Sequence, residues 1–168
     1  MPNNKWTTNN IPDLTGKVAI VTGANSGIGW DTAVALAEKS ATVIMACRNL
    51  VKSQAALDAL KTRVPNADVE LMQLDLASQA SVRQFADEFK AKYDQLDLLI
   101  NNAGIMMVPY ARTVDGFESQ FGTNHLGHFA LTGLLLERIL ATPGARVVNV
   151  SSGAHRMRSM NFDNLMYE

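Results

Sequence analysis

The stretch KVAIVTGANSGIG, residues 17–29, joins an apolar run to a turn that contains three glycines. The run KVAIV (17–21) has the continuous apolar character of a strand buried on both faces of a parallel sheet. From Gly27 to Lys39 the apolar residues recur at helical spacing instead. Glycine lets a phosphate approach the main chain, and a helix N-terminus adds free N–H donors and partial positive charge. The stretch therefore predicts a strand, a phosphate-binding turn and a helix.

The same alternation of strand and helix continues along the chain. Further strands are expected at 41–47, 68–74, 96–100 and 145–150, and helices at 51–64, from Ser78 to Tyr93, and at about 115–141. Alternation of this kind, with continuously apolar strands, favours a parallel sheet covered by helices on both faces. Right-handed crossovers then give a Rossmann-like, doubly wound α/β fold, with the expected strand order 3-2-1-4-5.

Composition limits the class of protein. Of 168 residues 47% are hydrophobic and the formal net charge is -1, so we expect a sizeable core and no global attraction to nucleic acid or an anionic membrane. Residues 1–15 are predicted to be a polar lead-in and 16–168 a single dinucleotide-binding domain. Cys47 is the only cysteine, so an internal disulfide is excluded and a reducing cytoplasm fits. No apolar run approaches the roughly 20 residues of a membrane span.

Five short motifs occur in order along the chain. They are TGANSGIG (22–29), LDLAS (74–78), NNAG (101–104), TNHLGHF (123–129) and VVNVSS (147–152). The glycine spacing is T-G-x-x-x-G-x-G rather than the G-x-G-x-x-G of the Rossmann fingerprint. In these motifs the chain resembles the short-chain dehydrogenase/reductase superfamily, over nearly its whole length from about Leu14. The segments MACRN, NHLGHF and SSGAH…NFDNL are most similar to its retinol-dehydrogenase-like branch.

The resemblance implies a cofactor site at the carboxyl ends of the strands, where open α/β sheets bind ligands. Around the diphosphate it implies Gly23, Asn25, Ser26, Gly27, Ile28 and Gly29. It places Asp75 and Leu76 beside adenine, and Asn101, Ala103 and Gly104 near the adenosine and nicotinamide riboses. Asn102 is expected to tie the fourth strand to its neighbours instead.

The end of the second strand indicates which dinucleotide is bound. The sequence there is ACRN, which places Arg48 about 20 residues after the glycines and contains no Asp or Glu. An acid would bind the ribose 2′-hydroxyl of NAD, whereas a guanidinium binds the 2′-phosphate of NADP. We therefore expect NADP(H) rather than NAD(H), with Asn49 supporting the same phosphate. The alternative is an ordinary solvated arginine.

The family that the chain resembles transfers a hydride between nicotinamide and a carbonyl or alcohol carbon, while a Tyr with a pKa lowered by a Lys moves the proton. By resemblance, Ser152 hydrogen-bonds the substrate oxygen, with Ser151 as the fallback, and Asn124 holds a water in the proton relay. Asn124 shares a helical stripe with Phe121 and His128, so we expect it to face inward. The alternatives are loop capping for the serines and a core Asn bonded to backbone carbonyls.

The family's Tyr-x-x-x-Lys motif is absent from this sequence. Tyr167 follows Ser152 but has no Lys partner, since no lysine follows Lys92. We therefore expect a chain that stops before the catalytic Tyr and lacks the family's C-terminal strands. The fifth strand would then be a sheet edge, apolar surface of the long helix would be exposed, and copies of the chain would tend to associate.

These observations predict an NADP(H)-dependent oxidoreductase that acts on a small carbonyl or alcohol substrate and is inactive as these 168 residues alone. One alternative is a module that binds NADP(H) without catalysis, which the missing Tyr and Lys favour. The other is an interaction protein that keeps the fold and has lost the cofactor, against which the intact glycine turn and Arg48 argue.

The histidines do not indicate metal or hydrolase chemistry. His125 and His128 lie three residues apart without an evident third ligand, and no G-x-S-x-G elbow surrounds Ser152 near His155. We therefore predict structural histidines and no metal. The methionines of two loop-like segments either line an apolar substrate pocket or fill gaps, and they are Met106, Met107, Met157, Met160 and Met166.

Overall fold

The computed structural model describes residues 5–156 and 159–167. A five-stranded sheet forms the centre of this part of the chain. Its strands are β1 (Val18–Thr22), β2 (Thr42–Cys47), β3 (Val69–Gln73), β4 (Leu98–Asn101) and β5 (Arg146–Asn149). Their order across the sheet is β3-β2-β1-β4-β5, and every neighbouring pair is parallel. The predicted Rossmann-like, doubly wound α/β fold is thus confirmed.

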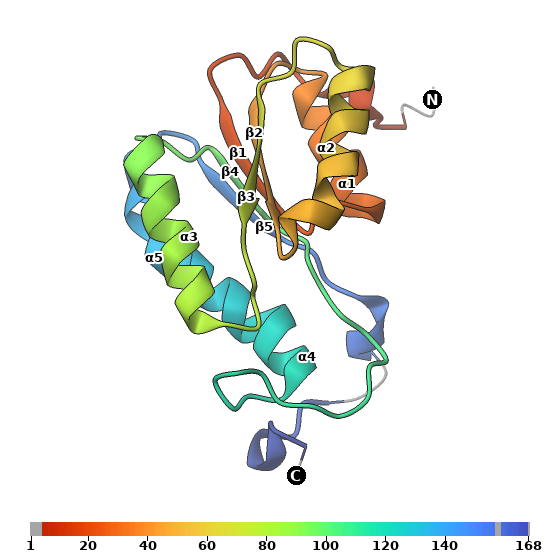
Figure 1. The fold of residues 1–168 in the computed structure, drawn as a ribbon, viewed down its shortest axis with the longest axis vertical. Helices are drawn as coiled ribbons and strands as arrows, with labels where there is room; N and C mark the ends of the chain where they lie inside the picture. The colour runs from red at the N-terminus through yellow and green to blue at the C-terminus, as the bar shows by residue number, and fades with distance from the viewer. Residues whose placement is uncertain (1–4, 157–158, 168) are drawn as a thin grey trace.

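Helices cover both faces of the sheet (Figure 1). They are α1 (Gly27–Ala37), α2 (Leu50–Arg63), α3 (Gln79–Lys92) and a long helix composed of α4 (Ser119–Phe121), the π-helical segment η2 (Gly122–Leu126) and α5 (Gly127–Ala141). Short 3-10 turns are η1 (Thr8–Asn10), η3 (Gly153–Arg156) and η4 (Phe162–Asn164). Helices α1 and α2 lie on one face, and α3 and α5 pack together on the other. Of the predicted lead-in, residues 1–4 lie outside the described part of the chain.

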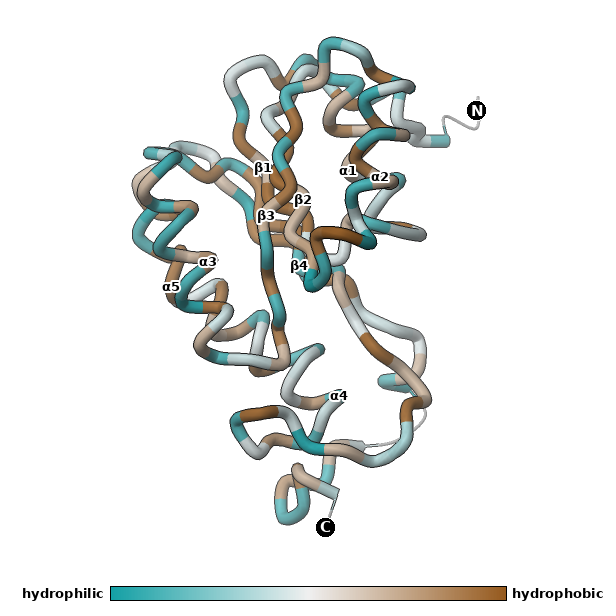
Figure 2. Tube along the Cα trace, in the orientation of Figure 1, coloured by the Kyte–Doolittle hydropathy of each residue, from teal (hydrophilic) through white to brown (hydrophobic). Residues whose placement is uncertain are grey.

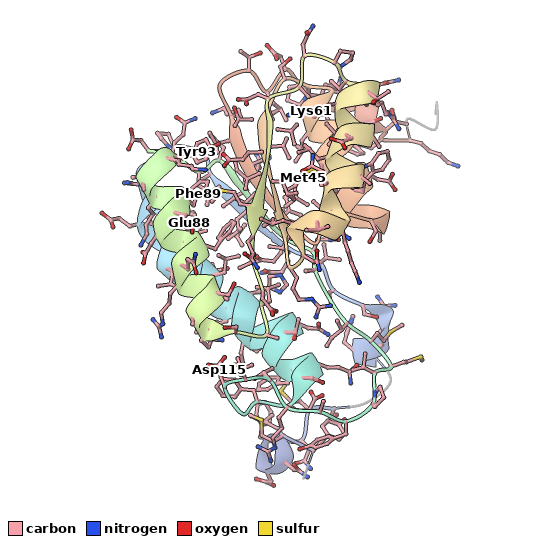
Figure 3. The ribbon with its side chains drawn as sticks, viewed as in Figure 1. Met45, Lys61, Glu88, Phe89, Tyr93 and Asp115 are labelled. Carbon is pink, nitrogen blue, oxygen red and sulfur yellow. The ribbon has the colours of Figure 1, made fainter. Side chains whose placement is uncertain are left out.

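A hydrophobic cluster on each side of the sheet joins the layers. Alternate residues of β1 point to opposite sides, so Val21 packs in the cluster of α1 and α2, whereas Ile20 packs in the cluster that contains Phe89 of α3. Phe89 stacks on Tyr93 (Figure 3), with ring centroids 5.0 Å apart. The Tyr93 hydroxyl donates a hydrogen bond to Glu70 of β3 at 2.9 Å. Burying a side chain of the size of Ile or Phe contributes about 1.5–3 kcal/mol. Figure 2 shows the strands as the most apolar part of the molecule.

The long helix starts later than predicted. Residues 114–117 form a turn and bend, in which Gly116 has a φ of +85°. The Glu118 carboxylate then caps the helix, because it accepts hydrogen bonds from the amides of Gln120 and Phe121 at 2.9 and 2.7 Å. The helix therefore begins directly after Glu118 rather than at about 115.

Strand β5 forms one edge of the sheet and is largely exposed. On the long helix, Phe129 is 73% exposed and Leu140 is 76% exposed, and Leu136 is exposed as well. The predicted sheet edge and the predicted apolar surface on the long helix are thus confirmed. None of the helices in residues 5–156 and 159–167 combines the length and the apolar character that a membrane crossing requires.

Candidate functional site

The turn between β1 and α1 uses its three glycines in different ways. Gly23 has a φ of +65°, and a Cβ there would lie 3.0 Å from the Cβ of Ala103. Gly27 has a φ of +54°, in the left-handed region that side chains disfavour. A Cβ on Gly29 would overlap the carbonyl oxygen of Gly23 and lie 2.5 Å from Nδ2 of Asn102. The missing side chains therefore let α1 pack directly against the turn.

A cavity of about 350 Å³ lies beside this turn, and we call it the glycine-turn cavity. Ser26 is the N-cap of α1, and its side chain accepts no capping hydrogen bond from the described residues, so the Ser26 hydroxyl does not compete for the first amides of the helix. Most of the predicted cofactor residues line the cavity, namely Gly23, Asn25, Ser26, Ile28, Gly29, Arg48, Asp75, Leu76, Ala103 and Gly104. Sequence reasoning missed five further lining residues, Ala46, Leu74, Asn102, Ile105 and Thr123, and their positions in or beside the motifs were the only signal.

Two predicted cofactor residues near helix starts lie outside the lining of the glycine-turn cavity within the described chain. Gly27 opens α1, where its conformation shapes the turn. Asn49 is the N-cap of α2, and its Oδ1 accepts a hydrogen bond from the amide of Lys52 at 2.9 Å. An Asn directly before a helix is a common N-cap, so the sequence carried the signal for this role.

The two asparagines of the NNAG motif join strands. Asn101 is 4% exposed, and its Nδ2 donates to Oδ1 of Asn149 on β5 at 2.8 Å. Asn102 donates through Nδ2 to the carbonyl oxygen of Thr22 at 2.9 Å, which confirms its expected structural role. The Asn101 side chain is thus directed at β5, because these two residues are paired in register across the sheet, and it lies outside the lining of the glycine-turn cavity among the described residues.

Two charged side chains line the glycine-turn cavity. Arg48 follows β2 and is exposed, whereas the preceding Cys47 is buried, and burial raises the pKa of its thiol. Asp75 follows β3, where its Oδ1 accepts from the amide of Ala77 at 3.0 Å and its own N–H donates to Oγ of Ser81 at 2.9 Å. The cavity therefore offers one cationic group for a phosphate and one anchored carboxylate for a hydrogen-bond donor.

A second cavity of about 730 Å³ lies between the end of β5 and the long helix, and we call it the β5 cavity. Residues 102–105 line both cavities. Both predicted catalytic residues, Asn124 and Ser152, line the β5 cavity, and so does Ser151. The structure thus places the candidate reaction residues in a cavity that shares residues 102–105 with the cavity of most candidate cofactor residues.

Asn124 is exposed, so the prediction that it faces inward is wrong. Its Oδ1 accepts a hydrogen bond from the Ile105 amide, and its Nδ2 donates to the Ile105 carbonyl, both at 2.8 Å. The π-helical segment η2 is wider than an α-helical turn, so Phe121, Asn124 and His128 do not share one buried stripe. Asn124 instead lines the β5 cavity. Its hydrogen bond to the Ile105 carbonyl agrees with the alternative prediction, but its exposure contradicts the core position which that alternative assumed.

Ser152 is exposed and lies between the end of β5 at Asn149 and the 3-10 turn η3, which begins at Gly153. Its Oγ accepts a hydrogen bond from the amide of Ala154 at 3.2 Å, which is the loop-capping role of the alternative prediction. The same side chain lines the β5 cavity. Capping and contact with a bound molecule are compatible, because a hydroxyl has a second lone pair and a proton to donate.

The two histidines of the long helix make contacts within the protein. His128 is 6% exposed, and burial lowers its pKa from the ordinary value of 6.5. His125 stacks on Phe121 with ring centroids 5.4 Å apart. Across the described residues, no group of three or more His, Cys, Asp or Glu side chains is placed to hold a metal ion.

Of the tyrosines and methionines considered in the sequence, the β5 cavity is lined by one methionine among the described residues. Tyr110 and Tyr167 are exposed. Met106 lines the β5 cavity, whereas Sδ of Met166 accepts a hydrogen bond from the Glu118 amide at 3.3 Å. Met157 lies outside the described residues.

The family model for short chain dehydrogenases matches residues 17–164 of the chain. The chain belongs to the short chain dehydrogenase family. The match extends from the first residue of the KVAIV run to the segment after Ser152, so it includes both cavities described above.

This short chain dehydrogenase is similar to curated proteins of the retinol-dehydrogenase-like branch. It is 50% identical over 155 residues to retinol dehydrogenase 12 from Homo sapiens, which covers 92% of this chain and 49% of that protein. It is 48% identical over 159 residues to polyprenol dehydrogenase from Homo sapiens, which covers 92% of this chain and 48% of that protein. The chain thus spans about half the length of the curated relatives it matches.

Solved structures of the same fold include proteins in complex with nicotinamide dinucleotides. An uncharacterized protein from Mycobacterium paratuberculosis is 50% identical and superposes with a TM-score of 0.82 over 96% of this short chain dehydrogenase and 56% of that chain. A short chain dehydrogenase from Escherichia coli CFT073, solved in complex with NADPH, is 26% identical with a TM-score of 0.75 over 92% of this chain and 67% of that chain.

Proposed function

We propose that this chain forms the NADP(H)-binding part of an oxidoreductase that transfers a hydride between nicotinamide and a carbonyl or alcohol carbon. The observation that carries this proposal is the glycine-turn cavity, in which Arg48 and the uncapped start of α1 line one space at the carboxyl ends of the strands. Membership of the family supports it, as does the NADPH complex of the Escherichia coli relative.

The residues of the glycine-turn cavity fit a dinucleotide. The amides at the start of α1 would bind the diphosphate, because a helix N-terminus presents unpaired N–H groups and positive potential. Arg48 would bind the 2′-phosphate that distinguishes NADP(H) from NAD(H). Asp75, which lines the cavity, would accept a hydrogen bond from adenine, and a ribose would lie beside Gly104. A bound nicotinamide would supply or accept the hydride.

The β5 cavity fits a small carbonyl or alcohol substrate. The Ser152 hydroxyl would donate to the substrate oxygen, where charge develops during hydride transfer. Asn124 would position the loop at Ile105 rather than supply a free amide, since both its polar atoms already bond the backbone there. The sequence contains no Tyr-x-x-x-Lys motif, so we propose that the 168 residues bind cofactor without turnover.

Paired titrations with NADPH and NADH test this proposal. We expect saturable binding of NADPH, with a Kd about tenfold or more below that of NADH, because Arg48 forms a charge-assisted pair with the 2′-phosphate. Arg48→Ala should raise the Kd for NADPH and leave that for NADH unchanged. Arg63→Ala, an exposed arginine paired with Glu38, is the matched control. Absence of binding to either dinucleotide would overturn the proposal and favour an interaction protein that has lost the cofactor.

A non-catalytic NADP(H)-binding module is the second candidate, because the sequence lacks the Tyr-x-x-x-Lys motif. Measuring the oxidation of NADPH in the presence of short aldehydes and ketones separates this module from the oxidoreductase. Turnover by these residues would show that a proton donor other than a Tyr-x-x-x-Lys pair is at work, and it would exclude the module. The oxidoreductase would be supported if the chain binds NADPH without turnover and turnover appears once the chain is extended by a segment with that motif.

A further inference from the structure

Thr22, the last residue of β1, forms hydrogen bonds to the loop of residues 102–105 that lines both cavities. It is fully buried at the end of β1. Its Oγ1 accepts hydrogen bonds from the amides of Asn102 and Ala103, each at 2.9 Å. Both amides belong to residues 102–105, which line the glycine-turn cavity and the β5 cavity. One buried hydroxyl therefore fixes the beginning of the loop.

The other end of this loop is fixed from the long helix. The Asn124 side chain pairs with the amide and the carbonyl of Ile105 at 2.8 Å each. The main-chain oxygen of Asn124 lies 2.9 Å from Nδ1 of His128, and Nε2 of His128 lies 2.9 Å from Oγ1 of Thr22. The bonds close a ring that runs from Thr22 through the loop to Asn124 and returns through His128. We call this set the Thr22–His128 ring.

The partners of His128 decide where its proton lies. The Asn124 carbonyl can only accept, so Nδ1 carries the hydrogen and donates to it. Nε2 then has a free lone pair and accepts the hydrogen of the Thr22 hydroxyl. The other acceptor near that hydroxyl, the carbonyl oxygen of Ile100, is farther away at 3.4 Å. The neutral imidazole with Nδ1–H therefore satisfies both of its nitrogens.

The position of His128 is itself fixed by packing. A Cβ on the neighbouring Gly127 would lie 2.9 Å from the Cβ of Leu76, so the absence of a side chain lets the helix seat closely on the segment after β3. His128 is therefore held against the sheet, whereas Asn124 is exposed; in the loop, Gly104 is exposed and residues 102, 103 and 105 are half-buried. Hydrogen bonds in the buried half of the ring are costly to lose, whereas those in the exposed half compete with water. The buried half thus determines how well the loop is held.

We propose that His128 is a positioning residue. Through Thr22 and Asn124 it holds the loop of residues 102–105, which lines both cavities, in place. The inference rests on the proposed function, because this loop matters for binding only if a dinucleotide occupies the glycine-turn cavity. His128 acts through its neighbours, since its two nitrogens are bonded to protein atoms.

Amide hydrogen exchange on the whole chain, without cofactor, tests the ring. Thr22→Val keeps the β-branched shape and removes the hydroxyl, whereas Thr22→Ser keeps the hydroxyl. The valine variant should speed exchange at residues 102–105 about tenfold or more relative to the central strands, because two half-buried amides lose their acceptor. The serine variant should stay close to the unaltered chain. His128→Phe should act like the valine variant, and His125→Phe, on the exposed side of the same helix, should have no effect.

NADPH titration of the same variants connects the ring to function. Thr22→Val and His128→Phe should raise the Kd about tenfold, with Thr22→Ser restoring most of the affinity. If the unaltered chain binds no NADPH but Thr22→Val still frees the loop, the proposed function fails and the positioning of the loop stands. If the unaltered chain binds NADPH and the valine and phenylalanine variants exchange as slowly as it does, the inference is overturned.

The tautomer of His128 gives a test that needs no variant. A long-range ¹H–¹⁵N spectrum of the unaltered chain at neutral pH should show a neutral ring with its proton on Nδ1 and a slowly exchanging Nδ1–H. A proton on Nε2, or a doubly protonated ring, would contradict the hydrogen-bond directions and with them the ring.

Discussion

Strands β1 and β5 both lead into candidate site residues at their carboxyl ends in one parallel sheet, but the central strand β1 and the edge strand β5 are embedded very differently. Every residue of β1 is buried, and its end passes into a turn in which Gly23 and Gly29 leave no space for a side chain beside each other and beside Asn102 and Ala103. Strand β5 is a largely exposed edge, and its end leads to Ser152, whose hydroxyl is held by one local hydrogen bond at 3.2 Å. The cofactor side of the site is thus shaped by close packing, and the reaction side by local hydrogen bonds.

This contrast explains what each side can do on its own. Close packing fixes backbone positions, so the amides at the start of α1 are held in place for the diphosphate that we propose binds there. An exposed turn keeps several conformations accessible, so Ser152 and Asn124 need further contacts to hold a substrate oxygen in place. Binding without turnover is the behaviour that this difference predicts for the chain.

The largest expected effect compares two leucines of α5. Leu131 is fully buried against the sheet and Leu140 is 76% exposed. Leu131→Ala should lower the free energy of unfolding by about 2–5 kcal/mol, because it removes buried apolar surface and leaves a cavity. Leu140→Ala should change it by less than about 0.5 kcal/mol. Urea unfolding followed by circular dichroism measures both, and equal losses would show that the outer face of α5 is covered in solution.

The second comparison concerns two glycines in helices. Gly29→Ala should lower NADPH affinity at least about tenfold and destabilise the fold, because its Cβ has no space beside Gly23 and Asn102. Gly133→Ala is the control, since no described atom lies within 4 Å of its Cβ position and the helix should gain about 0.5–1 kcal/mol. Calorimetric titration and thermal unfolding check both. Full affinity in the Gly29 variant would mean that the turn relaxes easily and is not the binding element.

The predictions from sequence agree best with the structure where residues are buried, because burial requires apolar side chains that can be recognised in the sequence. The strands were predictable because runs such as KVAIV are continuously apolar, and the buried strand positions confirm them. The orientation of Asn124 was not predictable, because the π-helical segment that changes it has no signature in the sequence. The side-chain pairing of Asn101 with Asn149 depends on strand register, which becomes visible only once the sheet is assembled. The cap at Asn49 was predictable and was missed in favour of a phosphate contact.

A third prediction concerns the exposed side of the long helix. Leu136 and Leu140 lie four residues apart and are both exposed, so they form an apolar stripe suited to self-association. Leu136→Lys combined with Leu140→Lys should weaken association, seen as a larger fraction of monomer by sedimentation velocity at a given concentration. Glu137→Lys, a charge reversal on the same helix, controls for net charge. A purely monomeric unaltered chain at high concentration would contradict the prediction.

The smallest expected effect is the pH dependence of stability that His128 causes. Burial lowers the pKa of His128 in the folded chain below its ordinary value of 6.5. Between the folded pKa and 6.5 the unfolded chain binds the proton more readily, so stability should fall as the pH falls below about 6.5 and be unaffected by this group above it. His128→Phe should reduce this slope, and His125→Phe should retain it. Urea midpoints at several pH values between 5 and 8 give the answer, and an unchanged slope in the His128 variant would assign the effect to another group.

The most direct measurement of the central claim is an NADPH titration followed residue by residue in ¹H–¹⁵N spectra of the chain. If the diphosphate binds at the start of α1 with its 2′-phosphate on Arg48, the amides of 23–29, Arg48, Asp75 and 102–105 should shift together with one Kd. The amides on the exposed side of α5 around Leu140 should not move. Shifts confined to other surfaces, or none at saturating NADPH, would contradict the account.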